Sequence, residues 1–273
     1  MKRFKQVTAG RLVYAVCYPR ADRRDTGQVR AEKAKMSSAA QDRLNRRHSW
    51  EKLEQVLAAN FTAEDLVVTL TYREEDLPAD RDTALRRLRA FIRDLRSQRK
   101  AQGLPTRYIY VTEGLHGDHR IHHHLVLNGA GRDLEAIRAL WTWGDQVEVQ
   151  PLDDDHYEAL AKYLTKEPRE YGNAEVGART WTPSLGLRRP EVETADVPDA
   201  VTLAAPPGAI ILERTVRPTE FGEFAYLKYY LPRPRSPVPE RYVRRRKNHI
   251  ETPRHSGLKP QLSSEKGHRR RSK

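Results

Sequence analysis

The sequence predicts an α+β fold in which an antiparallel sheet with helices lies between two basic ends of the chain. Three observations lead to this prediction. Segments with strand and helix periodicity alternate through the middle of the chain. The length of 273 residues is sufficient for one sizeable core with appendages. Finally, the net charge of +13 is concentrated at the two ends, because the middle is mildly acidic.

Four segments have the composition of β-strands, since each is rich in β-branched or alternating apolar residues. Two helices separate them. The first begins at Asp80 or Asp82 and continues to about Arg99, with apolar side chains three and four residues apart. The second covers about 133–143 and stops at Gly144. The β-α-β-β-α-β order is the ferredoxin-like (split βαβ) arrangement, with both helices on one face. The four strands are expected at 66–72, 107–113, 121–128 and 146–150.

The flanking segments are expected to add to this sheet. A strand at 11–18 and a helix at about 38–59 precede it, and a helix at 154–167 follows on the face left open. The stretch 168–208 reads as irregular because it is rich in Pro, Gly and Arg. Two further strands, near 209–216 and 224–231, extend or flank the sheet. We therefore divide the chain into a basic strand and helix, a central domain, a segment completing that domain and a basic disordered tail, at 1–59, 60–170, 171–232 and 233–273.

The basic ends indicate a polyanionic partner. Residues 233–273 contain 14 Lys and Arg against 3 Asp and Glu, and residues 1–50 contain 13 against 4. Clustered positive charge favours phosphate binding through counterion release. The alternative is a tail that only increases solubility. Few aromatic residues accompany these charges, which favours phosphate contacts blind to base sequence. The candidate contacts in the tail are Arg244, Arg245, Arg246 and Lys247.

Cysteine content and hydropathy restrict the compartment. The chain has one cysteine, Cys17, which excludes an internal disulfide and fits a reducing environment. The longest apolar runs are only a few residues, too short to cross a bilayer. We therefore expect a cytoplasmic protein without a membrane partner.

The segment 121–128 carries three consecutive histidines inside an apolar strand. Because strand side chains alternate, His122 and His124 project to one face and His123 to the other. Two imidazoles on one face are suitable ligands for a divalent metal. The preceding strand ends in Glu113, and a short hairpin can bring this carboxylate close to His122. The alternatives are partly exposed histidines that bind nothing and a structural zinc site, which lacks thiolate support here.

The helix at 154–167 contains two tyrosines with different expected roles. Tyr157 lies on the buried stripe, whereas Tyr163 falls off that stripe and shares a face with Lys166. Tyr163 is therefore the candidate nucleophile, and an ordinary surface tyrosine is the alternative. Tyrosine hydroxyls are weakly acidic (reference pKa about 10), so a nucleophile of this type needs a nearby cation or a metal-polarised electrophile.

Together these motifs resemble the HUH endonucleases, in particular the rolling-circle replication-associated (Rep) proteins of bacterial plasmids, phages and integrated elements. The strand 67–72 resembles the family's first strand motif, and 122–124 resembles its His-hydrophobe-His motif with histidine in the central position. The segment 163–166 is similar to the Tyr-x-x-Lys motif. The resemblance covers about 60–170. Ala159 stands where two-tyrosine members have a second nucleophile, which implies a single-tyrosine enzyme.

The resemblance implies a metal-dependent nicking and joining endonuclease acting on single-stranded DNA at a replication origin. His122, His124 and Glu113 would hold Mg²⁺ or Mn²⁺. Tyr163 would form a 5′-phosphotyrosine and release a 3′-hydroxyl, with Lys166 assisting.

Further candidates come from the same resemblance. Thr69 and Thr71 of the first strand motif are candidate DNA-binding residues. The sequence has no Gly-rich ATP-binding loop of the P-loop type, so a host helicase and a host polymerase are the expected partners.

Two alternatives share parts of this pattern. A conjugative relaxase or a single-tyrosine transposase uses the same chemistry, but relaxases usually take their third ligand from another histidine, which makes Glu113 the discriminating residue. A non-catalytic single-strand-binding module would bind DNA without forming a covalent product.

Overall fold

A computed structural model describes residues 1–20, 38–114, 120–166 and 180–233, with only the backbone described at 38–42. Residues 1–232 form one compact unit. The described chain contains two five-stranded antiparallel sheets and four helices, so the predicted α+β class is confirmed. The predicted disordered tail, including Arg244, Arg245, Arg246 and Lys247, lies outside the described residues.

The first sheet has the predicted ferredoxin-like topology. Its strand order is β6-β3-β5-β4-β7, with all neighbours antiparallel. The four predicted strands therefore occupy the split βαβ order, and β7 adds a short edge strand. The elements are β3 (Leu66–Leu70), α3 (Arg81–Ala101), β4 (Tyr108–Glu113), β5 (His122–Leu127), α4 (Asp133–Leu140), β6 (Val147–Pro151) and β7 (Thr182–Pro183).

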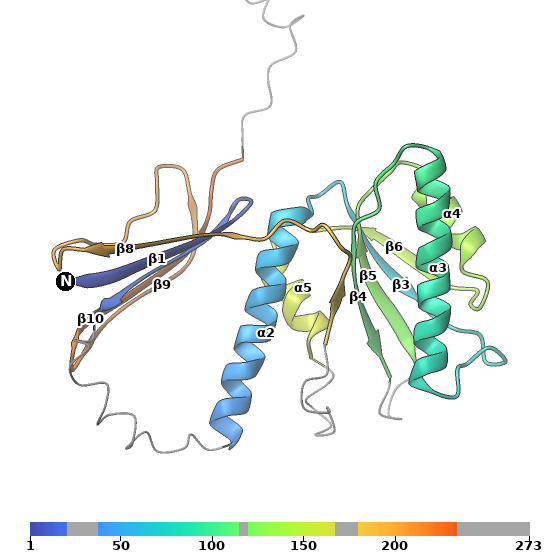
Figure 1. Ribbon diagram of the computed structural model, residues 1–273, viewed down its shortest axis with the longest axis horizontal. Helices are drawn as coiled ribbons and strands as arrows, with labels where there is room; N and C mark the ends of the chain where they lie inside the picture. The colour runs from blue at the N-terminus through green and yellow to red at the C-terminus, as the bar shows by residue number, and fades with distance from the viewer. Residues whose placement is uncertain (21–37, 115–119, 167–179, 234–273) are drawn as a thin grey trace, which may run out of the picture. The chain divides into compact units, whose positions relative to one another are not determined.

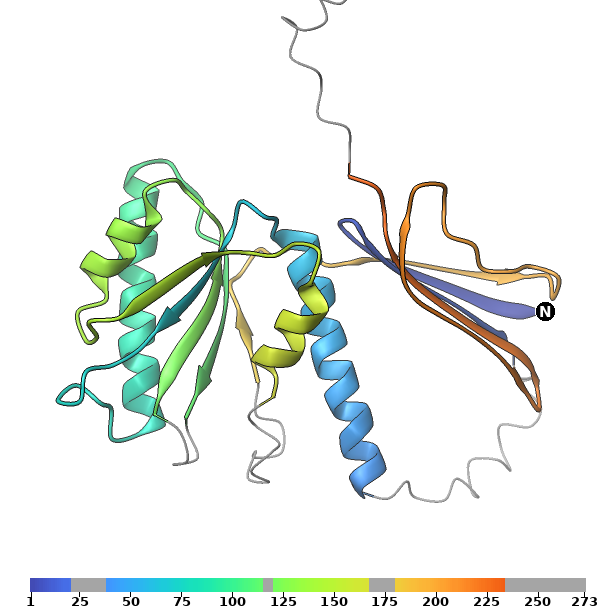
Figure 2. The same cartoon turned by 180° about the vertical axis from the view of Figure 1, so that it is seen from behind.

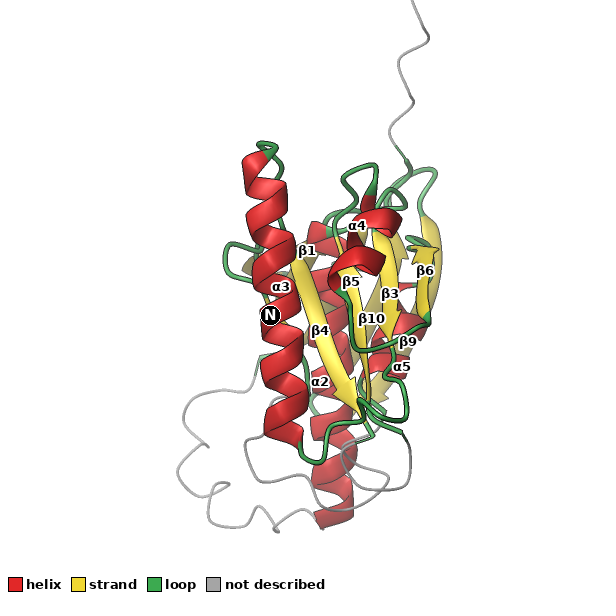
Figure 3. Ribbon diagram, turned by 90° about the vertical axis from the view of Figure 1, so that its right-hand side faces the viewer, coloured by secondary structure: helices red, strands yellow, loops and turns green. Residues whose placement is uncertain are grey.

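Helices α3 and α4 cover one face of this sheet (Figure 3). Helix α3 begins where the sequence indicates, since the Asp80 carboxylate accepts a 2.7 Å hydrogen bond from the Thr83 backbone N–H. Its predicted apolar stripe packs against alternate residues of the strands and against Trp141 at the end of α4. The buried members of the stripe are Leu88, Phe91, Ile92 and Leu95.

The opposite face is covered by α2 (Ser38–Asn60) and α5 (Tyr157–Leu164) (Figures 1 and 2). Both helices were predicted, at 38–59 and 154–167. Leu53 and Leu57 of α2 join Ala161 and Leu164 of α5 in one hydrophobic cluster. This layer also packs against the second sheet, because Leu12 and Tyr14 belong to the same cluster.

The second sheet corrects the prediction that the C-terminal strands extend or flank the first one. Its order is β8-β1-β2-β10-β9. The predicted strand at 11–18 is confirmed as β2, but residues read as a basic arm and as an irregular segment also form strands. Polar residues alternate along these edges, which hides their strand character. The elements are β1 (Lys2–Ala9), β2 (Leu12–Pro19), β8 (Glu191–Val197), β9 (Ile210–Thr219) and β10 (Gly222–Tyr230).

A buried ammonium connects the second sheet to both helices. Lys228 of β10 is 1% exposed, and its Nζ lies 2.8 Å from Glu54 Oε1 on α2 and 2.6 Å from Glu158 Oε2 on α5. The Tyr14 hydroxyl also donates a hydrogen bond to Glu54. Two carboxylates and a phenol thus compensate a charge that would be costly alone. The network fixes α5 against α2 and β10.

Candidate functional site

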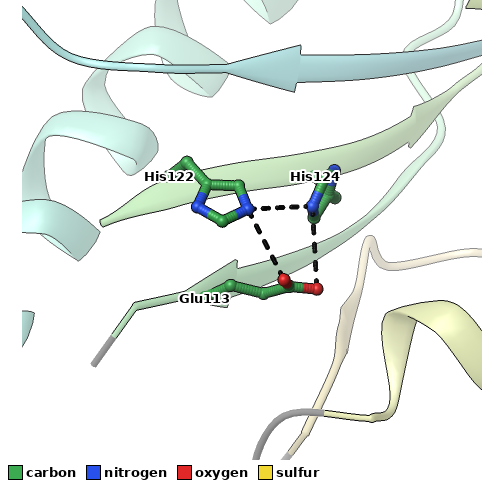
Figure 4. Close-up of side chains that lie close together, drawn as sticks. All are labelled: Glu113, His122 and His124. Atoms are coloured by element: carbon green, nitrogen blue, oxygen red, sulfur yellow. Dashed lines mark hydrogen bonds and ion pairs between the residues drawn. The ribbon is translucent and has the colours of Figure 1, made fainter. Parts of the chain in front are cut away.

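The hairpin of β4 and β5 brings Glu113 and the histidines together. Glu113 is the direct partner of His122 in the antiparallel register, as the sequence predicts. His124 lies two residues further on and therefore shares the face of His122. Figure 4 shows the carboxylate of Glu113 pointing toward both imidazoles.

The three side chains converge through one atom each. His122 Nε2 and His124 Nε2 are 3.1 Å apart. Glu113 Oε2 lies 3.5 Å from His122 Nε2, and Glu113 Oε1 lies 3.6 Å from His124 Nε2. Two imidazole nitrogens and a carboxylate form a donor set for a borderline or hard divalent ion. Among the described residues, this is the one group of three such side chains that could hold a metal ion.

The inner ring nitrogens of both histidines are held by neighbouring groups. His122 Nδ1 lies 2.8 Å from the Arg120 carbonyl oxygen, which can only accept, so Nδ1 carries the proton. His124 Nδ1 lies 3.2 Å from Thr69 Oγ1. Such outer contacts fix ring orientation and direct the Nε2 lone pair toward a metal. The sequence prediction gave Thr69 a DNA-binding role, whereas its hydroxyl contacts a candidate ligand. The pairing of Thr69 with His124 in adjacent strands was the available signal.

Glu113 has the burial and charge expected of a ligand. It is 3% exposed, and Oε1 has no hydrogen-bond partner among the described residues. Burial raises the pKa of the carboxyl, but His122, His124 and the Lys166 ammonium beside it lower it more, so the pKa lies well below its ordinary value. A buried, ionised carboxylate with an unpartnered oxygen fits a cation placed between the three side chains.

His123 lies on the other face, as strand alternation predicts. Its Nε2 is 2.7 Å from the Tyr72 hydroxyl and its Nδ1 is 2.8 Å from Thr112 Oγ1. The residue is fully buried, and burial lowers its pKa to about 3. Both nitrogens are therefore occupied inside the core, which explains how histidine replaces a hydrophobic residue at this position.

Helix α5 presents Tyr163 to this group and buries Tyr157, as predicted from helical spacing. Tyr163 is 44% exposed, and its hydroxyl lies 3.2 Å from His124 Nε2. Lys166 Nζ lies 3.7 Å from the centre of the Tyr163 ring and 3.5 Å from Glu113 Oε2. In contrast, Tyr157 is 5% exposed and donates a 2.5 Å hydrogen bond to the Phe61 carbonyl.

Not all predicted site residues join this group. The Thr71 hydroxyl donates a 2.9 Å hydrogen bond to the Gln146 carbonyl and so links the end of β3 to β6. The motif at 181–184 supports the sheet edge, since Tyr108 N–H donates to Ser184 Oγ at 3.1 Å. Its signal was present in the sequence, but its place beside β4 was not.

A ferredoxin-like sheet that carries a Glu-His-His group is the architecture implied by the resemblance to replication-associated proteins. Residues 65–168 match the family model of the replication-associated protein ORF2. Over this segment the chain belongs to that family, consistent with a rolling-circle Rep protein of the HUH superfamily. The match begins one residue before β3 and ends shortly after α5, so it spans the whole candidate site.

Neither the curated proteins nor the solved structures include a significant match to this chain. The family supports a role in DNA replication. No helix in the described ranges is long and apolar enough to cross a membrane.

Proposed function

We propose that this protein is a rolling-circle replication initiator that nicks and rejoins single-stranded DNA by tyrosine transesterification. The observation that carries the proposal is the position of the Tyr163 hydroxyl, 3.2 Å from His124 Nε2 at the Glu-His-His group. A nucleophile candidate and a candidate metal group thus lie within reach of one phosphate. The family match supports the same role.

Glu113, His122 and His124 are the proposed ligands of Mg²⁺ or Mn²⁺. The unpartnered oxygen of Glu113 and the oriented imidazoles support this assignment. When bound, such an ion polarises the scissile phosphate and neutralises its charge. Affinity order favours Mn²⁺ at a site with two imidazoles, and cellular abundance favours Mg²⁺.

The proposed reaction exchanges one phosphodiester for another. The Tyr163 oxygen attacks the phosphorus, and the bond from phosphorus to the 3′ oxygen breaks. The phenol loses its proton, and the departing 3′ oxygen gains one, so a 5′-phosphotyrosine and a 3′-hydroxyl result. The 3′-hydroxyl can prime synthesis. Because the phosphodiester energy is retained, a later hydroxyl can reverse the step and reseal the strand.

Lys166 is proposed to assist Tyr163. Its ammonium lies 3.7 Å from the centre of the tyrosine ring, where a cation favours the developing phenolate. Its 3.5 Å contact with Glu113 also ties the end of α5 to β4. Lys166 therefore both orients the nucleophile and supplies positive charge beside the reacting phosphate.

The proposed partners are an origin in single-stranded form, a host helicase and a host polymerase. The sequence has no P-loop to power unwinding, so strand separation would come from another protein. Cys17 is a buried free thiol, which supports action in the reducing cytoplasm.

A denaturing gel with labelled single-stranded DNA from the gene's own locus and Mn²⁺ tests the proposal. Wild type should give a metal-dependent protein–DNA adduct, and Tyr163→Phe should give none while retaining DNA affinity. Tyr157→Phe is the matched control on the same helix and should still form the adduct. An adduct that persists in Tyr163→Phe would move the chemistry elsewhere. DNA binding without any adduct, across several candidate origins and metals, would favour a non-catalytic binding module.

A further inference from the structure

The second sheet presents aromatic and basic side chains together at one end of its strands. In the two hairpins, Arg3 pairs with Tyr18 and Phe224 pairs with Arg217. The hairpins join through Cys17 and Ala225, so Tyr18 and Phe224 are neighbours across β2 and β10. Two rings therefore lie side by side in one row, with an arginine at each end.

Strand alternation places this row on the same face as Tyr14, which packs against α2. Helix α2 approaches the sheet at the opposite end of the strands, where a Cβ at Gly10 would come within 2.3 Å of the Ala58 carbonyl oxygen. Lys5, in the next row, is exposed and pairs with Val16. We name Arg3, Lys5, Tyr18, Arg217 and Phe224 the aromatic face.

The rings of the aromatic face are accessible, unlike other aromatic residues on the same strand. Tyr18 is 40% exposed and Phe224 is half-buried, whereas Tyr229 and Tyr230 further along β10 are 6% and 2% exposed. The Arg217 guanidinium lies 4.9 Å from the centre of the Phe224 ring. A planar cation stacked on a ring keeps the ring upright and leaves charge at its edge.

The charges of the aromatic face indicate what it binds. Arg217 and Lys5 are exposed, and Arg3 shares Asp196 with Arg20, at 3.0 and 2.7 Å. The rings are thus flanked by more cations than anions. Accessible rings between cations are the combination that single-stranded nucleic acids require, because bases stack on rings while phosphates meet Lys and Arg. Duplex DNA keeps its bases stacked inside and would gain only the phosphate contacts.

We propose that the aromatic face is a second binding site for single-stranded DNA, separate from the residues of the Glu-His-His group. Bases stack on Tyr18 and Phe224, and Arg217, Lys5 and Arg3 hold the phosphates. The choice of DNA as the nucleic acid rests on the proposed function. The site binds the strand without regard to base sequence, since every base offers a π-face.

Binding is tested with the full chain carrying Tyr163→Phe, so that no adduct forms, and a fluorescently labelled oligo(dT) of about 20 nucleotides. Tyr18→Leu and Phe224→Leu keep apolar volume but remove the ring. Each should weaken binding by about 5- to 100-fold, the range found when one stacked base loses its aromatic partner. Phe224→Trp should retain the affinity because it restores a ring.

A matched pair on β9 tests the charges. Arg217 lies on the aromatic face, whereas Arg214, which pairs with Leu227, lies on the opposite face of the same strand. Arg217→Ala should weaken binding and reduce the slope of log affinity against log salt by about 0.7, as expected for one lost phosphate contact to a single strand. Arg214→Ala should leave both unchanged.

Several outcomes would overturn the proposal. These are oligo(dT) affinity that is absent in the parent chain or unchanged in both Leu variants, an equal loss of duplex binding, and an equal effect of Arg214→Ala. Thermal melting identifies a variant that unfolds, in which case the other Leu variant decides. Adduct formation by the Tyr163 chain on a short oligonucleotide is measured separately, so its absence counts against the nicking proposal and not against this site.

Discussion

The two faces of the first sheet receive consecutive histidines and give them opposite environments. On the face covered by α3 and α4, His123 is sealed among aromatic residues and stays neutral. On the face covered by α2 and α5, His122 and His124 meet a buried carboxylate and a half-exposed tyrosine. The same residue type in one strand thus serves the core on one side and a candidate metal group on the other.

The difference lies in how many ring nitrogens the protein satisfies. His123 has a hydroxyl partner at each nitrogen, from Tyr72 and Thr112. His124 has Thr69 at its inner nitrogen, while its outer nitrogen points at the cluster. The comparison teaches that the covering layer decides whether a histidine is internally complete or available to a ligand.

The largest expected effect separates the two faces directly. His124→Ala removes a proposed ligand, so it should abolish adduct formation and weaken Mn²⁺ binding by more than about 100-fold, beyond the loss of an outer contact. Its fold should persist. His123→Ala should instead lower the free energy of unfolding by about 2–4 kcal/mol, because it opens a cavity and strands two hydroxyls. Calorimetric Mn²⁺ titration and urea unfolding of both variants measure the contrast, and equal metal affinities would break it.

The next effect concerns the layer that covers the open face. Lys228→Met leaves Glu54 buried without its ammonium partner, which should cost about 3–5 kcal/mol of stability near pH 7. Burial already raises the pKa of Glu54, and removing Lys228 raises it further. A carboxyl with a raised folded pKa destabilises the fold above its unfolded pKa of about 4.3, so the deficit should shrink as pH falls toward that value.

Urea unfolding at pH 7 and pH 5 measures this dependence. The double variant Lys228→Met/Glu54→Gln is the control, since it removes the buried charge and should recover much of the loss. A deficit of the same size at both pH values would mean that lost packing, and not the unpaired carboxylate, is responsible.

The smallest effect compares one threonine on each face. Thr69→Val removes the contact to His124 Nδ1 and should weaken Mn²⁺ binding by about 10- to 100-fold. Thr112→Val removes the contact to His123 Nδ1 and should leave metal binding unchanged. The two changes are chemically identical, and each threonine lies in a strand beside β5. Equal Mn²⁺ affinities in the two variants would show that Thr69 does not orient the ligand.

Much of the first sheet and its candidate site could be predicted from local pattern. Strand alternation separates His123 from its neighbours, and the short hairpin sets Glu113 opposite His122. Helical spacing separates Tyr163 from Tyr157, because a core stripe repeats every three to four residues. These features depend on residues close in sequence, where periodicity carries most of the information.

The second sheet could not be predicted because its information is non-local. Strand β8 is almost wholly exposed and has no apolar alternation, so its pairing with β1 has no local signature. Strand β1 begins with three cations in its first five residues and reads as a charged arm. The irregular reading of 168–208 was therefore wrong at 182–183 and 191–197. The domain boundaries and the roles of Tyr163 and Lys166 remain predictions.

The pairing of β1 and β2 with β8 and β10 has a consequence for the order of events during synthesis. The first hairpin leaves the ribosome long before its partners, since Leu12 pairs with Tyr230 and Lys2 with Val197. Contacts of such separation form late because a long loop must close first. The ammonium that neutralises Glu54 belongs to the last strand of this sheet. The helix that carries Tyr163 therefore gains its final support only when residue 228 has been made, so an incomplete chain lacks the finished site.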